Sequence, residues 1–340
     1  MSPGIRRSTK LLAGLLVTAV CSWFVLRQVD VDRIGSLLLS ADPSWILLGL
    51  SFLGTAYTFR IIRWWLMLRS IAPELSLTSC AGPFLCSIAL NNLLPFRAGD
   101  IMRVVGFCRQ LTLPASSVLG SLVLERLLDL AAILVVFFAT FPSVSPEGFP
   151  SEMLVTARWL AAVCIGLIGL VIVIPERCAS LARSIAGIIQ RYRWDRLGCL
   201  ARWISDFLSS IALMRARQQI VPLVLLSLGA WCMEGAVFAT VANALHIGEP
   251  GIAPWFALST GTLGTLLPST PGYVGTFDYL TMLGFMAYGV PKSPAAACAL
   301  LIHVVLWVPQ TIVGMVWLLV IKLRPAAPAM ESRPSAEVSA

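Results

Sequence analysis

The sequence predicts an all-α membrane protein that crosses the bilayer several times. Of its 340 residues, 58% are hydrophobic and only 12% are charged, which is about half the charged fraction of an ordinary soluble domain. The mean hydropathy is +0.85, and several apolar runs reach the ~20 residues that a helix needs to cross a bilayer. These values exclude a water-soluble globular fold and a disordered chain.

About six apolar segments are predicted as full spans. In chain order they cover residues 11–25, 44–62, 116–141, 154–174, 219–242 and 294–321. The first follows Arg6, Arg7 and Lys10 and resembles a signal peptide, but it lacks a cleavage site and is predicted to remain as a span. Pro309 is expected to kink the last span.

The positions of the basic residues orient these spans. Twenty of the 25 Lys and Arg residues lie in five segments, namely 1–10, 60–78, 97–112, 176–218 and 322–340. Because cytoplasmic loops are enriched in Lys and Arg, these segments are predicted to face the cytoplasm. Both termini are therefore expected in the cytoplasm, and the protein in a plasma membrane of the bacterial inner-membrane type.

Two further apolar stretches are interrupted. The first is predicted to enter the membrane and return to the same side, and the second to be either a re-entrant element or two short spans with a break between them. Residues 79–95 lie between two segments assigned to the cytoplasm, and residues 252–290 begin and end on the opposite side. The residues that break the helices are Pro95 in the first stretch and Pro268, Pro271, Gly272 and Gly275 in the second. We predict two broken or re-entrant elements that enter from opposite faces. Such pairs are typical of inverted repeats, with the binding site between them.

Charged residues within apolar segments are the first candidates for a site, because each costs roughly 2.5–3.5 kcal/mol on insertion scales. The densest group consists of Arg97, Asp100, Arg103, Glu125, Arg126 and Asp129. A broken helix offers free backbone N–H groups, and adjacent arginines add donors, which suits a lipid phosphate. The alternative is a charge network that locks helices together, with Arg97 or Arg103 neutralising Glu125 and Asp129.

Other polar residues have more than one interpretation. Asp278, after the second break, is expected to face the cavity rather than to cap the helix that resumes there. Glu234 lies near the centre of its span and is either a protonatable coupling site or a protonated, hydrogen-bonded group. His303 is expected to be a packed interhelical residue. Arg60 and Arg63 are predicted to be interfacial anchors at the end of the second span.

The rest of the sequence limits the partners. The chain has two histidines and nine cysteines without a metal-binding pattern, so no metal and no cofactor is expected.

Residues 1–323 are predicted to form a single transmembrane domain, followed by a disordered cytoplasmic tail, 324–340. The basic segment 176–218 is either an amphipathic helical pair on the anionic lipid surface or a basic loop without a binding role. Nucleic-acid binding is not expected.

Three motifs occur in order: Asn92-x-x-Pro95-x-Arg97-x-Gly99-Asp100-x-x-Arg103, then Glu125-Arg126-x-x-Asp129, then Pro268-x-x-Pro271-Gly272-x-x-Gly275-x-Phe277-Asp278. Over about residues 10–320 the chain resembles the membrane, flippase-like domain of the lysylphosphatidylglycerol synthases. It departs from them at Asp100 and Asp278, where Glu is as common, and at Tyr273, where a second Gly is usual. The resemblance implies a division of labour in the two-domain members. The soluble domain synthesises aminoacylated phosphatidylglycerol, and the membrane domain moves this lipid between leaflets.

The resemblance implies a stand-alone form, because nothing after residue 321 is expected to fold into a soluble domain. Candidate head-group contacts are Arg97, Arg103, Asn92 and Gly99. Candidate network or gating residues are Asp100, Glu125, Arg126, Asp129, Asp278 and Glu234.

The predicted function is that of a lipid translocase or lipid-binding protein rather than an enzyme. It would hold a polar phospholipid, such as an aminoacylated phosphatidylglycerol or another lipid-linked head group, in a cavity between the two broken elements. One alternative is an intramembrane enzyme acting on a lipid phosphate or polyprenyl phosphate, with Asp100 or the Glu125 and Asp129 pair as general base. Another is an accessory subunit of a separate lipid-modifying enzyme.

Overall fold

The computed structural model describes residues 30–141, 206–210, 220–248, 251–266 and 271–323, with a few isolated positions between 155 and 166. Several predicted features lie outside the described residues: the span at 11–25, nearly all of the span at 154–174 and of segment 176–218, Pro268, and the tail 324–340. In the described part every regular element is a helix.

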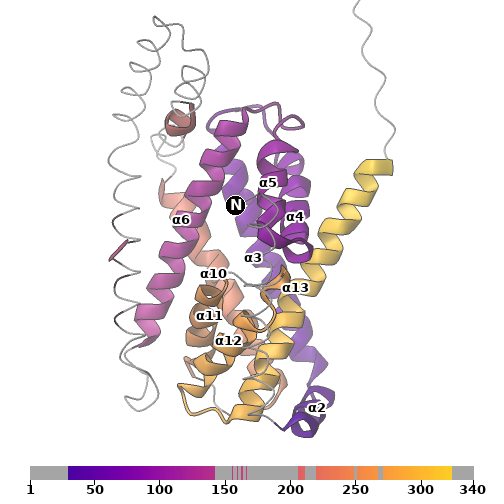
Figure 1. Cartoon of the computed structure of the whole chain (residues 1–340), viewed down its shortest axis with the longest axis vertical. Helices are drawn as coiled ribbons and strands as arrows, with labels where there is room; N and C mark the ends of the chain where they lie inside the picture. Colours follow the sequence, from indigo (N-terminus) through magenta and orange to yellow (C-terminus); the bar gives the residue numbers. More distant parts are fainter. Residues whose placement is uncertain are drawn as a thin grey trace, which may run out of the picture.

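Nine α-helices and two short 3-10 helices are described (Figure 1). The α-helices are α2 (Val31–Leu39), α3 (Pro43–Arg69), α4 (Leu77–Leu93), α5 (Ala98–Val105), α6 (Ala115–Thr140), α10 (Ile220–Ala244), α11 (Ala253–Gly264), α12 (Thr276–Met286) and α13 (Lys292–Leu323). The 3-10 helices, η1 (Pro95–Arg97) and η4 (Pro271–Tyr273), lie at the two predicted helix breaks.

Three of the described helices are long and apolar enough to cross a membrane, namely α3, α10 and α13. Helix α6 has 26 residues, which gives a length of about 39 Å, but it contains Glu125, Arg126 and Asp129. The predicted count of about six spans therefore stays a prediction. Helix α13 continues through Pro309 to its end at Leu323.

Helix α3 is longer than the sequence pattern indicates. Asp42 caps its first turn by accepting a hydrogen bond from the backbone N–H of Ser44, and Pro43 occupies the first helical position, where its missing N–H costs nothing. The helix ends at Arg69 rather than near residue 62. Arg60 and Arg63 therefore lie inside the helix and not at its end.

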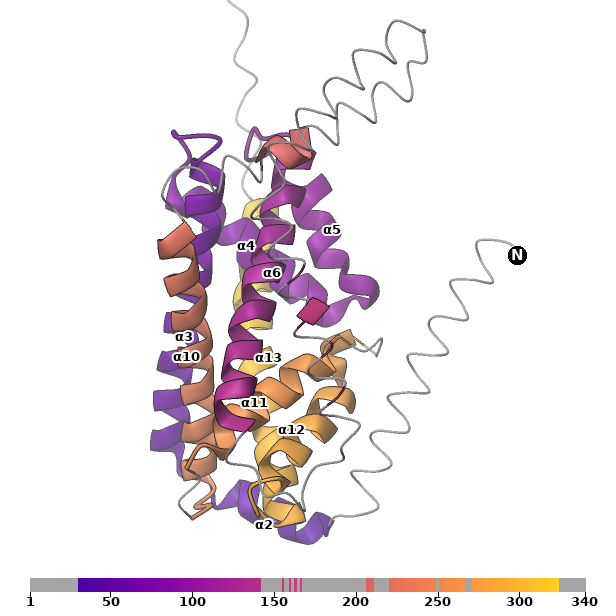
Figure 2. The same ribbon diagram turned by 90° about the vertical axis from the view of Figure 1, so that its left-hand side faces the viewer.

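The chain turns back within the bundle at the first break. Residues at the end of α3, the start of α4 and the segment after α5 share one buried cluster, which includes Trp64, Leu68, Cys80, Cys108 and Leu111. Helix α4 therefore leaves one end of the bundle and α5 returns to the same end. In Figures 1 and 2 both helices occupy the upper half of the molecule.

The second break has the opposite orientation. Phe256 near the start of α11 and Ala287 just after α12 pack together, with Phe137 near the end of α6. These contacts lie at the other end of the bundle, so α11 and α12 occupy the lower half of the views (Figure 2). With 12 and 11 residues, the two helices reach only about 18 Å each. The two hairpins thus point toward each other from opposite ends.

Candidate functional site

The first break has a local cause. Leu94 is extended, with φ −109° and ψ 145°, because the proline that follows disfavours a helical conformation at this position. Pro95 starts η1, and Arg97 has left-handed backbone with φ 52°. The new helix α5 begins at the next residue, so Arg97 lies at the tip of the hairpin.

The second break depends on left-handed backbone at three positions. Gly272, Tyr273 and Gly275 have φ values of 73°, 61° and 85°. Glycine adopts this conformation without steric cost. Tyr273 adopts it as well, at the position where the family resemblance leads us to expect glycine. The backbone at this position is therefore left-handed, as glycine would allow, although the residue is tyrosine.

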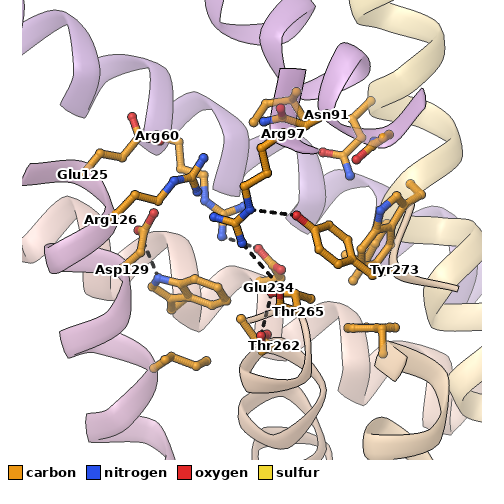
Figure 3. Close-up of a pocket in the computed structure, with 18 of the residues that line it drawn as sticks. Arg60, Asn91, Arg97, Glu125, Arg126, Asp129, Glu234, Thr262, Thr265 and Tyr273 are labelled. Carbon is orange, nitrogen blue, oxygen red and sulfur yellow. Dashed lines mark hydrogen bonds and ion pairs between the residues drawn. The ribbon is translucent and has the colours of Figure 1, made fainter. Parts of the chain in front are cut away.

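The tips of the two hairpins contact each other. The Arg97 Nε donates a hydrogen bond to the Tyr273 hydroxyl at 3.0 Å, and Nη2 lies 3.4 Å from the carbonyl oxygen of Thr265. Figure 3 shows the Arg97 side chain extending from the first break toward Tyr273. A Cβ atom on Gly272 would lie 3.6 Å from the carbonyl oxygen of Asn92. The two interrupted stretches, about 175 residues apart in sequence, thus meet in space.

A cavity of about 290 Å³ lies where the breaks meet. Its polar lining includes Arg60, Asn91, Asn92, Arg97, Glu125, Arg126, Asp129, Glu234, Thr262, Thr265 and Gln310. Its apolar lining includes Trp231, Leu263, Phe277, Leu306 and Trp307. Such a mixed wall, which combines apolar surface with convergent polar groups, is typical of a ligand site.

Four ion pairs between different helices surround the cavity. They join Arg60 to Glu234 (2.5 Å), Arg63 to Asp129 (2.6 Å), Arg103 to Glu125 (2.9 Å) and Arg126 to Asp100 (3.1 Å). Buried pairs of this kind persist because losing one partner leaves an uncompensated charge. The alternative interpretation of the sequence, a charge network that joins helices, is therefore part of the structure.

Arg103 belongs to this network and does not line the cavity. Its side chain is fully buried, donates to the Ser87 hydroxyl and the Glu125 carboxylate, and lies against the rings of Trp64 and Phe84. The structure thus places Arg103 behind the cavity wall, away from the head-group position that we predicted.

Two other predicted site residues also support the first hairpin. A Cβ on Gly99 would collide with the Ser87 carbonyl oxygen, so this glycine permits close packing of α5 on α4 rather than contact with a ligand. Asp100 binds the Asn91 amide at 2.8 Å and the Arg126 guanidinium. Asn92, by contrast, lines the cavity and donates to Thr311 on α13.

The prediction that Arg60 and Arg63 are interfacial anchors is wrong. Both are buried in α3 and paired with Glu234 and Asp129, and they are not interfacial anchors. Asp129 also accepts a hydrogen bond from the Trp231 indole at 3.2 Å. One sequence signal could have identified these two arginines. Their spacing of three residues places both on one helix face, and the carboxylates in other apolar segments, Asp129 and Glu234, need cationic partners.

Asp278 does not line the cavity, contrary to our expectation. It accepts a hydrogen bond from the backbone N–H of Gly275 at 2.8 Å and so caps α12. Its other oxygen lies 2.6 Å from Nδ1 of His303, which is the packed interhelical residue that we predicted. Among the described residues, no group of three or more His, Cys, Asp or Glu side chains is arranged to hold a metal ion.

Arg97 is the arginine of this region that has no carboxylate partner among the described residues. The other four arginines around the cavity each pair with one carboxylate. Arg97 instead contacts a phenol hydroxyl and a backbone carbonyl, which are both neutral. The described site therefore carries one uncompensated positive charge at the joint of the two breaks.

Comparison with protein families agrees with this architecture. The family model described as the lysylphosphatidylglycerol synthase TM region matches residues 11–314. The chain belongs to this family. The match includes both broken hairpins and the helices that carry the ion pairs.

Two relatives are similar to most of this chain. "Glycosyltransferase AglD" of Haloferax volcanii is 26% identical over 328 residues, and the match covers 87% of this chain and 52% of that protein. The chain thus spans about half the length of that relative. "UPF0104 membrane protein MJ1595" of Methanocaldococcus jannaschii is 21% identical over 327 residues, covering 92% of this chain and 96% of that protein.

Proposed function

We propose that this membrane protein binds the phosphate of a polar lipid in the central cavity and moves the lipid between leaflets. The observation that carries this proposal is the position of Arg97. Its guanidinium lines the cavity without a carboxylate partner among the described residues. A guanidinium binds phosphate through parallel, charge-assisted hydrogen bonds.

A second guanidinium supports the same site. Arg126 lines the cavity, and its side chain remains 38% exposed although Nη2 is bound to Asp100. The apolar wall, which includes Trp231 and Phe277, suits the acyl-chain side of a lipid. Charged and apolar side chains line the same cavity, as an amphipathic ligand requires.

The two hairpins supply a route to the site. In this proposal α4 with α5 and α11 with α12 are re-entrant elements that enter from opposite faces of a plasma membrane, with both termini in the cytoplasm. Breaks that meet near the middle of a bundle are typical of transporters whose binding site lies between inverted repeats. Opening of one hairpin at a time would expose the cavity to one leaflet at a time.

A second candidate follows from the relative in Haloferax volcanii, whose name is that of a glycosyltransferase. In this candidate the chain presents a lipid-linked substrate to a separate lipid-modifying enzyme. An enzymatic role for the cavity itself has less support. Asp100, Glu125 and Asp129 are the candidate bases, and each is already bound to an arginine.

The test is inter-leaflet movement of head-group-labelled anionic phospholipid in liposomes that contain the purified full-length protein. We expect Arg97→Gln to reduce the rate roughly 10- to 100-fold, since a hydrogen bond to a charged group contributes about 1.5–3 kcal/mol. Arg109→Gln is the matched control, because it removes the same charge from an exposed position. Movement that is unaffected by Arg97→Gln would refute the site, and absence of movement with the unsubstituted protein would favour the second candidate.

A further inference from the structure

The charges around the cavity indicate which head groups it accepts. Each carboxylate that lines it is already paired: Glu125 with Arg103, Asp129 with Arg63 and Glu234 with Arg60. Asp100, next to the cavity, is paired with Arg126. A positively charged head group would therefore find no free carboxylate among the described residues.

The same head group would also meet unfavourable charge. An ammonium group brought beside a phosphate at Arg97 would lie next to a guanidinium that has no carboxylate partner in the described structure. To gain a counterion it would have to separate one of the four ion pairs, which would leave an arginine unpaired, and a buried one in three of the four cases. Selection against a ligand by an unpaired like charge is a common source of specificity.

The wall that α13 contributes to the cavity, here called the neutral wall, carries polar groups without charge. Trp307 and Gln310 are one turn apart on α13, and both line the cavity. The Trp307 Nε1 and the Gln310 Oε1 are buried without a hydrogen-bond partner among the described residues, and Gln310 is only 9% exposed. Buried polar groups are normally hydrogen-bonded, so two orphaned atoms on one face of one helix need an explanation.

Neighbouring contacts hold this wall in place. Trp307 packs edge-on against Phe277 at 4.7 Å and lies beside His303 at 4.4 Å, measured between ring centroids. Asn92 crosses from the tip of the first hairpin to Thr311 on the next turn of α13, at 2.8 Å. An indole N–H and a side-chain amide together offer donors and an acceptor, which hydroxyl groups can use in both directions.

We propose that the cavity selects anionic lipids whose phosphate carries an uncharged, hydroxyl-bearing head group, and that it discriminates against aminoacylated head groups. Arg97 binds the phosphate, and Trp307 with Gln310 binds the hydroxyls. This inference rests on the proposed function, because it assigns the head group to the same site.

The experiment measures binding of four lipids with identical acyl chains to the full-length protein in phosphatidylcholine nanodiscs. Phosphatidylglycerol and phosphatidylinositol carry hydroxyls, lysylphosphatidylglycerol carries an added amine, and phosphatidic acid has the phosphate alone. We expect either hydroxylated lipid to bind at least about tenfold more tightly than lysylphosphatidylglycerol or phosphatidic acid. If phosphatidylinositol binds more tightly than phosphatidylglycerol, the preferred head group is a ring. If phosphatidylglycerol binds more tightly, the preferred head group is an open chain.

Two variants separate the neutral wall from the phosphate site. Trp307→Phe removes the N–H and keeps a ring, and Gln310→Leu removes the amide at similar volume. Both are expected to lower the preference for the hydroxylated lipid over phosphatidic acid by roughly three- to tenfold and to leave phosphatidic acid binding unchanged. Trp317→Phe, elsewhere on α13 against Phe107, is the matched control.

The outcomes are distinguishable. Lysylphosphatidylglycerol bound as tightly as phosphatidylglycerol would overturn the inference and leave the proposed function intact. An unchanged preference in Trp307→Phe and Gln310→Leu would overturn the role of the neutral wall. Failure of all four lipids to bind would overturn the proposed function itself, and the inference with it.

Discussion

The two helix breaks reach the same cavity but are built from different interactions. The first is held by charged side chains, with Asp100 bound to Arg126 and Arg103 bound to Glu125. The second is held by backbone conformation, with left-handed residues at Gly272 and Gly275 among others. The chemistry of the site therefore resides mainly at the first break, and its shape depends mainly on the second.

The largest expected effect tests whether charge holds the first break. Arg103→Met leaves Glu125, which is 2% exposed, without its guanidinium. We expect the free energy of unfolding to fall by about 3–5 kcal/mol, because an unpaired buried charge is costly. Denaturant titration of the protein in detergent measures the change.

Two companion variants make this result specific. Arg103→Met combined with Glu125→Gln should recover most of the loss, since it removes both charges. Arg109→Met, at an exposed position, should change little. A loss below about 1 kcal/mol in the single variant would mean that charge does not hold this hairpin.

A smaller effect tests whether backbone conformation holds the second break. Alanine at Gly272 would meet no atom closer than 3.6 Å, so only its φ of 73° opposes the change. We expect Gly272→Ala to lower the free energy of unfolding by about 1–2 kcal/mol. Gly35→Ala is the control, because that helical glycine has open space around it. Equal stability of the two variants would contradict this view of the second break.

The smallest effect is expected for the charge at the second break. Asp278→Asn keeps an oxygen for the Gly275 N–H and an amide that can face His303. We expect a loss below about 1 kcal/mol, whereas Asp278→Leu should lose the cap and cost up to about 2 kcal/mol. Thermal unfolding of the two variants side by side distinguishes them. If Asp278→Asn lowered the free energy of unfolding as much as Arg103→Met does, charge would hold both breaks equally, and the proposed difference between them would be wrong.

Much of the architecture follows from hydropathy and charge alone. Closely spaced proline and glycine disfavour a continuous helix, so the positions of both breaks were predictable, although α13 continues through the single Pro309. The described helices turn back within the bundle at both breaks. That residues 79–95 and 252–290 each return to the same side of a membrane stays a prediction from the bias of basic residues. The number of spans remains a prediction, because two predicted segments lie outside the described residues.

The pairing of the charges was less predictable, since it depends on how helices rotate against one another. Arg126 lies within reach of Asp129 along α6, yet it binds Asp100 on α5, while Asp129 binds Arg63 on α3. Local spacing describes only neighbours on one helix. Arginines near the end of an apolar run look like interfacial anchors unless their partners on other helices are known, which explains the error at Arg60.

The contact between the two tips has a consequence for affinity. Two of the four non-glycine residues with left-handed backbone in the described chain, Arg97 and Tyr273, touch each other there. A phosphate that takes the Nε and Nη2 donors of Arg97 must displace the Tyr273 hydroxyl and the Thr265 carbonyl oxygen. The Tyr273 hydroxyl and the Thr265 carbonyl oxygen thus compete with the phosphate for the donors of Arg97. A hydrogen bond worth about 1 kcal/mol weakens such binding roughly fivefold, and a ligand held less tightly also departs faster.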